Sequence, residues 1–461
     1  MTGPRTLDLR PEAAWRALRV TTWCLYALIF LAAFESLAVT TVMPTVSTAL
    51  DGASLYAAAF AAPLAAGVVG MVVAGGWADR HGPRGPLAAS VVLFAAGLVV
   101  AGVAPTMWIF VAGRLVQGLG GGGLTVAAYV VVARLYPALL HPRVFAGFAA
   151  AWVVPSLVGP PVAGLVAEHV GWRWVFLGVA AIVVPVALVV LANVTHVGAP
   201  DEPPQDAGTG RVRWSVLAAA AVLGLNLAGE VASPWSVVIA VVATIVVLVA
   251  LRPLLPTGSL RLVRGLPSVV GGRALLAGAF FGAEVYLPYL LTRRYDLSPA
   301  LAGVTLTAAA LAWAGGSWLQ GRLAGRVSDR DCVRLGTALV AAGIAGSCVV
   351  AAMHAPTLVL VVTWACAGGG MGLTYPRQSV LVLGYSRPGT QGANTAGLTI
   401  ADSTGAAWAL AVSGLVFAAG SGLDTPFVAV LVFTTALAFA AAAVAGRVAA
   451  PGKLATATSQ D

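Results

Sequence analysis

The chain is poor in charged residues. Only 9% of its 461 residues are Asp, Glu, Lys or Arg, whereas a typical soluble domain has about 25%. Lys453 is the only lysine, so almost all of the basic residues are arginines. Hydrophobic residues make up 59% of the chain, which is more apolar sequence than a core surrounded by water can bury. A water-soluble fold is therefore excluded, and lipid is the expected solvent.

Patterns typical of metal sites and enzymes are also missing. The 4 cysteines contain no CxxC pair and the 5 histidines no HExxH spacing, so neither a disulfide framework nor a metal site is predicted. The glycine run 120–123 lacks the Lys-Ser/Thr of a nucleotide-binding loop, and close helix packing explains it better. Because no nucleophile–base set stands out either, we expect no cofactor, no metal and no enzymatic activity.

Long apolar runs are abundant instead. A helix needs ~20 apolar residues to cross a bilayer, and an open strand cannot satisfy its backbone groups in lipid. The fold class is therefore all-α and polytopic. Six helices are predicted near 20–48, 53–78, 86–104, 107–134, 144–167 and 174–195. After a polar linker at 196–213, six more are predicted near 268–291, 298–320, 335–353, 356–376, 391–418 and 425–446.

Two further apolar runs, 214–229 and 231–251, lie between these sets. Basic residues favour the cytoplasmic side of a membrane. If both runs cross the membrane, or if neither does, the basic residues lie on the same side of the membrane as the N-terminus, with few exceptions. The exceptions are Arg114, Arg173, Arg293 and Arg294. We expect both runs to cross, because the hairpin between them carries only Glu230. This gives fourteen spans with both termini in the cytoplasm, and twelve spans with both runs on the surface is the alternative.

Several short motifs occur twice at a nearly constant spacing. GGWADRHGPR (75–84) aligns with GRVSDRDCVR (325–334) at an offset of 250 residues. GGGGLT (120–125) aligns with GGMGLT (369–374) at an offset of 249, and Glu35 meets Glu284 at the same offset. The repetition predicts a six-helix half at 1–196, a linker with two extra helices at 197–267, and a second six-helix half at 268–461. Parallel halves related by an axis along the membrane normal are a known transporter plan.

On these motifs the chain resembles the major facilitator superfamily. Residues 75–84 match the family signature between the second and third helices, and RLVQG (114–118) matches its Arg-x-x-Gln-Gly motif in the fourth helix. VGPPVAG (158–164) is similar to the Gly-Pro motif of the fifth helix, which the family associates with antiporters. The motif residues there are Gly159, Pro160 and Gly164. Pro155 stands where that motif usually has glycine, and Cys332 replaces a glycine of the loop signature.

The extra central pair of helices makes the chain similar to the fourteen-helix drug:proton antiporter branch. This resemblance implies two halves with pseudo-two-fold symmetry and a proton-coupled exporter of small amphiphilic or lipophilic molecules, such as drugs or secondary metabolites, working by alternating access. It implies a monomer in the plasma membrane, with the bilayer, protons and a small-molecule substrate as partners and no nucleic acid. The net charge of +9 is then explained by cytoplasmic loops. A proton symporter that imports a solute is the alternative, and a membrane receptor or enzyme is a remote one.

The repeated loop motif is expected to act as a gate. The resemblance places Asp79 against the N-terminus of the helix that begins near Gln391, where an exposed carboxylate is worth roughly 0.3–1 kcal/mol. Such a contact would hold the two halves together on the cytoplasmic side. The residues assigned to gating are Gly75, Asp79, Arg80, Arg84, Asp329, Arg330 and Arg334. The alternative is a basic loop that only fixes topology.

Ionisable residues inside a span are costly, about 2.5–3.5 kcal/mol each on insertion scales, and are usually functional. We single out Glu35, Arg114, Glu284 and Asp402. Glu35 and Arg114 are expected to couple transport to protons, with Gln117 as a secondary candidate. A static ion pair between Glu35 and Arg114 is the alternative.

The remaining candidates lie in the second half. Glu284 is expected to bind a cationic substrate or a second proton, and a protonated, hydrogen-bonded carboxyl group is the alternative. Asp402 is a secondary candidate that could instead bond within its own bundle. Arg377 is another. It is expected to extend its charge towards the membrane surface, and a position facing the central cavity is the alternative.

Overall fold

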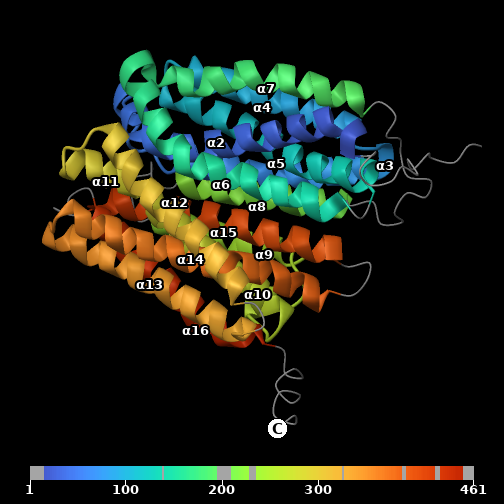
Figure 1. Ribbon diagram of the computed structural model, residues 1–461. Coiled ribbons are helices and arrows are strands. Elements are labelled where there is room, and N and C mark those ends of the chain that lie inside the picture. Colours follow the sequence, from blue (N-terminus) through green and yellow to red (C-terminus); the bar gives the residue numbers. More distant parts are fainter. Residues whose placement is uncertain are drawn as a thin grey trace, which may run out of the picture. The chain divides into compact units, whose positions relative to one another are not determined.

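The computed structural model describes residues 15–137, 140–194, 209–227, 235–323, 326–386, 391–420 and 426–449. These residues are almost entirely helical (Figure 1). The predicted linker residues 196–208, the hairpin residue Glu230 and the motif residue Gly325 lie outside the described residues.

Every predicted span corresponds to a helix. The first six are α2 (Arg19–Ala49), α3 (Ala58–His81), α4 (Arg84–Gly102), α5 (Met107–Leu135), α6 (His141–Val166) and α7 (Arg173–Asn193). The central pair is α8 (Thr209–Leu227) and α9 (Trp235–Leu251). The last set is α10 (Leu266–Glu284), α11 (Tyr286–Arg294), α12 (Pro299–Arg322), α13 (Asp329–Met353), α14 (Thr357–Tyr385), α15 (Gln391–Ala419) and α16 (Pro426–Val444).

Eleven helical segments among the described residues are long and apolar enough to cross a membrane, with α10 and α11 together forming one of them. A twelfth is added when the two parts of α6, Ala150–Ser156 and Val158–Gly171, which meet at a 48° bend, are taken as one span. Proline residues cause this kind of bend, because they remove a helical hydrogen bond. The bonds that Pro160 and Pro161 lack are those to the carbonyls of residues 156 and 157, at the bend. The chain is therefore a multi-span membrane protein.

The chain forms two compact units. Unit 1 comprises Met1–Asp51 and Ala66–Arg213, and unit 2 comprises Gly52–Ala65 and Trp214–Asp461. In unit 1, α2 packs against α5, α6 and α7, while α4 packs against α5 and α7. In unit 2 the same pairings recur, with α10 against α14, α15 and α16, and α13 against α14 and α16. The sequence repeat thus has a counterpart in helix packing, whereas the domain boundaries at 196 and 267 stay a prediction.

Glycine allows α4 and α5 to approach closely. A Cβ atom on Gly120 would lie 2.6 Å from the Ser90 carbonyl oxygen, and one on Gly113 would lie 2.6 Å from the Ala101 backbone nitrogen. Neither position can hold a side chain without moving a helix backbone. The glycine run in α5 therefore serves helix packing, as small residues do in membrane proteins generally.

Much of the first copy of the repeated motif is helical, although its sequence is that of a loop. Helix α3 continues through His81, so Asp79 and Arg80 lie in its last turn. Gly82 then adopts φ of +86°, and its N–H donates to the Ala78 carbonyl at 2.9 Å. Glycine takes this left-handed conformation without a steric penalty, and α4 begins only two residues later at Arg84. The motif is thus a tight helix–helix corner.

The first helix of the second set is divided at Val285, immediately after Glu284. The Tyr56 hydroxyl, from the Gly52–Ala65 segment of unit 2, donates to the Val285 carbonyl at 3.0 Å. The Tyr56 ring stacks on Tyr289 of α11, with 4.7 Å between the ring centroids. The division is therefore packed and hydrogen-bonded from one side.

Candidate functional site

Unit 1 contains a buried network of three polar side chains on α2 and α5. Arg114 donates to Glu35 Oε1 and to Gln117 Oε1, and Gln117 Nε2 donates to Glu35 Oε2. The side chains of Arg114 and Glu35 are only 4% and 2% exposed. Arg114 and Gln117 lie three residues apart on α5 and therefore share a helix face. Both oxygens of the Glu35 carboxylate thus have a donor.

The close approach of α4 to α5 supports this network. A Cβ atom on Gly97 of α4 would lie 2.6 Å from the Cβ atom of Gln117. The sequence analysis did not single out Gly97, because a glycine in an apolar run gives no sign of which residue it faces. Gly97 therefore positions α4 directly behind the network.

The predicted antiporter motif lies on α6, which packs against α2. Gly159, Pro160 and Gly164 are buried in α6, just beyond its bend. A Cβ atom on Gly159 would meet Phe34 Cδ2 at 3.6 Å, which is an ordinary contact. Phe34 precedes Glu35 directly, so the bent part of α6 packs next to the residue that carries the buried carboxylate.

The two copies of the loop motif differ in their contacts. In the first copy, Asp79, Arg80 and Arg84 are exposed. Asp79 has no hydrogen-bond or ion-pair partner among the described residues of unit 1, and Gly75 makes only an ordinary contact with Val126. Arg134 at the end of α5 donates to the Ala78 carbonyl at 3.1 Å, which ties the motif backbone to α5.

In the second copy, Asp329 accepts from Arg377 Nη1 at 2.8 Å, and Arg377 Nη2 donates to the Gln320 carbonyl at 3.0 Å. These bonds join α12, α13 and α14. Arg377 was expected to extend towards the membrane surface, but its side chain is only 8% exposed, because these two acceptors hold it inside unit 2. Arg330 lies beside Gly446, and Arg334 is exposed.

Glu284 is the last residue of α10, at the division before α11. It is partly exposed, and among the described residues of unit 2 its carboxylate has no hydrogen-bond or ion-pair partner. The aromatic residue one turn before it, Phe280, stacks on Trp364 with 4.7 Å between the ring centroids. Glu284 therefore lies one helical turn from a stacked aromatic pair.

A second ion pair, which is partly buried, lies within unit 2. Arg273 Nε donates to Asp402 Oδ1 at 2.8 Å, and the Tyr375 hydroxyl donates to the same oxygen at 2.8 Å. Arg273 Nη1 also donates to the Tyr375 carbonyl at 3.1 Å and to Gln378 Oε1 at 3.3 Å. The sequence analysis missed Arg273, although its place inside the predicted span 268–291 was a usable signal.

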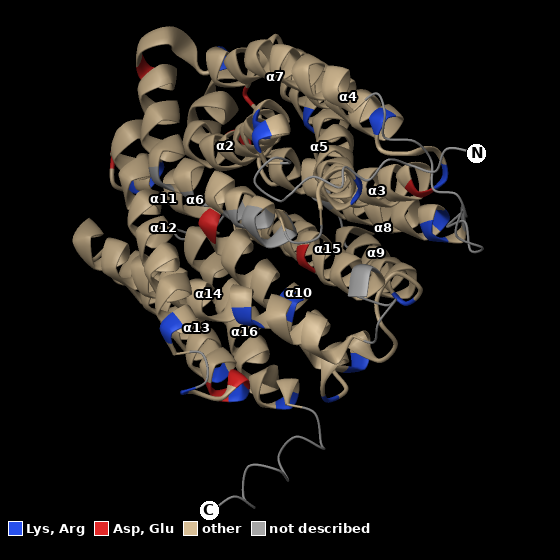
Figure 2. Cartoon of the chain, turned by 45° about the vertical axis from the view of Figure 1, so that its right-hand side comes forward, with Lys and Arg blue, Asp and Glu red and all other residues tan. Residues whose placement is uncertain are grey.

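Charge is otherwise scarce inside the helices. Figure 2 shows most of the described chain without charged residues, and the Lys, Arg, Asp and Glu residues lie mainly towards helix ends. Buried ion pairs within a repeated bundle of long apolar helices are typical of proteins that move solutes across membranes. The fold and the buried charges thus define the class of a polytopic membrane transporter.

A model of the Major Facilitator Superfamily matches residues 25–396. Because this match covers most of the chain, the chain belongs to that family. The family and the fold point to a transporter rather than to an enzyme.

Two curated relatives carry efflux names. A probable multidrug-efflux transporter of Mycobacterium tuberculosis is 26% identical over 405 residues, covering 82% of this chain and 83% of the relative. An MFS efflux transporter of Aspergillus oryzae is 32% identical over 249 residues, covering 51% of this chain and 44% of the relative. The chain spans less than half the length of the fungal relatives it matches.

Solved structures share the fold at low sequence identity. A D-xylose-proton symporter superimposes with a TM-score of 0.67 and 14% identity, covering 94% of this chain and 98% of that one. A POT family transporter in complex with 5-aminolevulinic acid superimposes with a TM-score of 0.69 and 14% identity, and the match covers 96% of each chain. At this identity the likeness establishes the fold alone.

Proposed function

We propose that the chain is a proton-coupled exporter of small amphiphilic or lipophilic molecules, such as drugs or secondary metabolites, and that Glu35 carries the proton. The observation that carries this proposal is the buried network of Glu35, Arg114 and Gln117. Two relatives named as efflux transporters support the direction of transport.

The geometry of the network favours a proton-carrying role of Glu35 over a static ion pair that only holds α2 against α5. When Glu35 is ionised, Arg114 and Gln117 both donate to it. When Glu35 is protonated, Arg114 still has an acceptor in Gln117 Oε1, so the guanidinium is not left without a partner. Buried polar groups are costly when unpaired, and this arrangement avoids that cost in both protonation states.

The substrate side of the proposal rests on Glu284. An unpaired carboxylate inside an apolar helix bundle attracts cations through its charge. Many amphiphilic drugs are aromatic cations, so we propose that Glu284 binds the positive charge of such substrates. The alternative, a second proton on Glu284, would reduce the transport of charged and neutral substrates equally.

The gating role of the repeated motif is part of the same proposal. Asp79 is exposed and has no arginine partner in unit 1, so its charge is available for a helix N-terminus such as that of α15. The same gating role is proposed for the other residues of the two motif copies, which are Gly75, Arg80, Arg84, Asp329, Arg330 and Arg334.

We also propose that α8 and α9 cross the membrane, which gives the fourteen spans of the drug:proton antiporter branch, a linker region at 197–267, and cytoplasmic termini in a plasma-membrane protein. Helix α9 has no charged residue and carries exposed apolar side chains on several faces. A helix lying on the membrane surface needs a polar face, and α9 lacks one. Its 17 residues reach about 25 Å, close to the ~30 Å of the hydrocarbon core.

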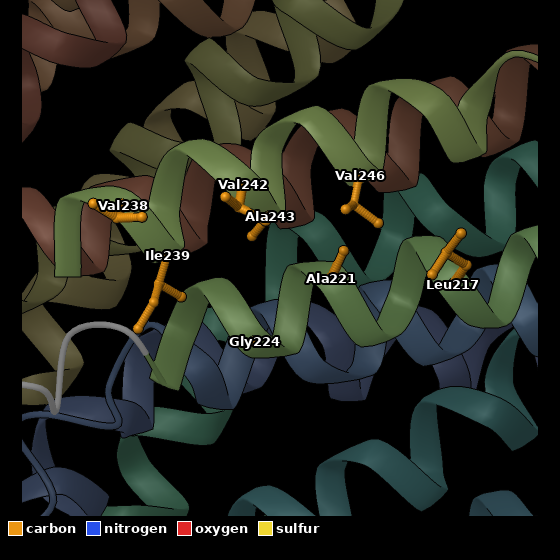
Figure 3. Close-up of a pocket in the computed structure, with 8 residues that line it drawn as sticks. All are labelled: Leu217, Ala221, Gly224, Val238, Ile239, Val242, Ala243 and Val246. Carbon is orange, nitrogen blue, oxygen red and sulfur yellow. The ribbon is translucent and has the colours of Figure 1, made fainter. Parts of the chain in front are cut away.

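A groove between α8 and α9 agrees with this arrangement. Its cavity volume is about 290 Å³, and all of its lining residues are apolar. In Figure 3, Leu217 and Ala221 of α8 face Val242 and Val246 of α9 across the groove. Such a groove is compatible with lipid and costly in water.

A thiol-labelling experiment tests the span count. Glu230→Cys in a chain without its native cysteines should react with an impermeant thiol reagent added outside intact cells. Labelling only after lysis would show that the pair does not cross, and the twelve-span arrangement would replace it.

Transport by Glu35→Gln tests the coupling. In everted vesicles, a pH gradient should drive the accumulation of ethidium by the wild type but not by Glu35→Gln, while ethidium binding is retained. Glu168→Gln makes the same chemical change at an exposed position and should transport normally. Uphill transport by Glu35→Gln at the wild-type rate would remove Glu35 from the mechanism. Accumulation in the opposite direction would instead favour an importing proton symporter.

A further inference from the structure

The four residues Arg273, Tyr375, Gln378 and Asp402 form a polar network in the interior of unit 2. Asp402 lies eleven residues after Gln391, the first residue of α15, which corresponds to about 16 Å along the helix. The side chains of Arg273 and Asp402 are 12% and 25% exposed, so the pair is partly buried.

Each member of this network keeps a partner whether Asp402 is charged or neutral. With Asp402 ionised, Arg273 and the Tyr375 hydroxyl both donate to Oδ1. With Asp402 protonated, Arg273 keeps the Tyr375 carbonyl and Gln378 Oε1 as acceptors. The Tyr375 hydroxyl can rotate and accept the new O–H, because a hydroxyl both donates and accepts.

Among the described residues of the helices that pack most against α15, the only cations are Arg273 and Arg377. Helices α9 and α16 carry no charged residue. On α14, Arg377 is bonded to Asp329. On α10, the only other charged residue is Glu284, eleven residues beyond Arg273, or about three helical turns. Arg273 is therefore the counter-ion of Asp402.

The Asp402 network has the same pattern of hydrogen bonds as the Glu35 network in unit 1. In both units an arginine binds one carboxylate and keeps a glutamine Oε1 as a second acceptor, Gln117 in unit 1 and Gln378 in unit 2. The helices differ, because Arg114 lies on α5 while Arg273 lies on α10. The likeness is therefore not a remnant of the sequence repeat, which aligns neither the arginines nor the carboxylates.

We propose that Asp402 is a second proton-carrying carboxylate, with Arg273 as its counter-ion, so that two protons enter for each substrate exported. A proton from the outer water binds the Asp402 carboxylate, and the guanidinium of Arg273 keeps Gln378 Oε1 and the Tyr375 carbonyl as acceptors. Release of that proton to the cytoplasm restores the ion pair. This inference rests on the proposed function and adds its stoichiometry.

The steady-state gradient measures the number of protons. In proteoliposomes with the membrane potential held at zero, a pH difference of one unit supports about a hundredfold ethidium gradient with two protons and about tenfold with one. The wild type should reach the hundredfold value and Asp402→Asn the tenfold value. Asp296→Asn, at an exposed residue outside the spans with φ of +51°, is a control that should match the wild type, because asparagine tolerates this conformation.

A double variant separates a proton carrier from a structural brace. If the pair only holds α10 against α15, Arg273→Gln/Asp402→Asn removes both charges together and should regain the hundredfold gradient. That result would overturn the proposal, as would a hundredfold gradient with Asp402→Asn alone. A wild type that builds no gradient would overturn the proposed function itself, whereas a tenfold wild-type gradient unaffected by Asp402→Asn would overturn only this inference.

A binding measurement covers variants that fold but do not transport. Adding ethidium to purified protein in weakly buffered detergent should release two protons from the wild type and one from Asp402→Asn, read with a pH-sensitive dye. Equal proton release from both proteins would contradict a proton on Asp402.

Discussion

Replacing Gly120 with alanine tests the close packing of α4 against α5. The added Cβ would lie 2.6 Å from the Ser90 carbonyl oxygen and 2.6 Å from the Phe94 Cα atom. Both are backbone atoms and cannot rotate away. The neighbouring residue Gly121 provides a matched control, since its Cβ would meet only the Phe94 ring, at 3.5 Å. The two variants thus make the same chemical change in adjacent positions of one helix.

The expected difference follows from two opposing effects. Alanine gains about 0.5–1 kcal/mol over glycine within a helix, and this gain is common to both variants. Overpacking a close contact costs about 1–3 kcal/mol, and only Gly120→Ala incurs it. The common gain cancels in the comparison, so Gly120→Ala should be less stable than Gly121→Ala by about 1–3 kcal/mol. For a unit of this size, this corresponds to a melting temperature lower by about 2–12 °C.

The measurement is thermal unfolding of both purified variants in lipid nanodiscs, at one scan rate and with the wild type alongside. Because α5 also carries Arg114 and Gln117, Gly120→Ala should reduce export driven by a pH gradient, whereas Gly121→Ala should not. Equal melting temperatures, or a lower one for Gly121→Ala, would refute the close approach of α4 and α5.

Three further predictions concern charged residues. Arg114→Met leaves Glu35 buried without a counter-ion and should destabilise the protein by about 3–5 kcal/mol. The double variant Glu35→Gln/Arg114→Met should recover most of the melting temperature but not uphill export. Recovery of export would show that the ion pair has only a structural role. Asp79→Asn should lower export at normal expression and shift the labelling of cytoplasmic cysteines, and unchanged transport would leave the motif as a topology signal. Glu284→Gln should slow the export of ethidium but not of a neutral dye, and equal losses would make Glu284 a proton carrier.

Most of the helices could be predicted from the sequence, because lipid requires long apolar runs and charges mark their ends. The corner at Gly82 was harder, since Asp79 and Arg80 look like loop residues although α3 continues through them. The division at Val285 gave no signal in hydropathy, because both sides of it are apolar. The positions of spans are thus set by composition, whereas breaks within them depend on neighbours such as Tyr56.

The candidate sites were predictable only in part. Glu35 and Arg114 were found because each is a charge inside a span, and the structure places them together. Arg273 satisfied the same criterion but was passed over, and its partner Asp402 is separated from it by 129 residues. A single sequence identifies buried charges but does not say which of them meet. The pairing of Arg377 with Asp329 was missed for the same reason.

The pair formed by Arg377 and Asp329 makes the two motif copies unequal. The residues that correspond to Arg377 in the first half, by either repeat offset, are Ala127 and Ala128, and both are fully buried. The second carboxylate is therefore neutralised inside its own unit, whereas the charge of Asp79 remains exposed. Exposed charges are screened by salt far more than buried ones. Under the proposed gating role of Asp79, raising the salt concentration should therefore weaken the first copy more than the second, in which the buried Arg377 holds the half-exposed Asp329.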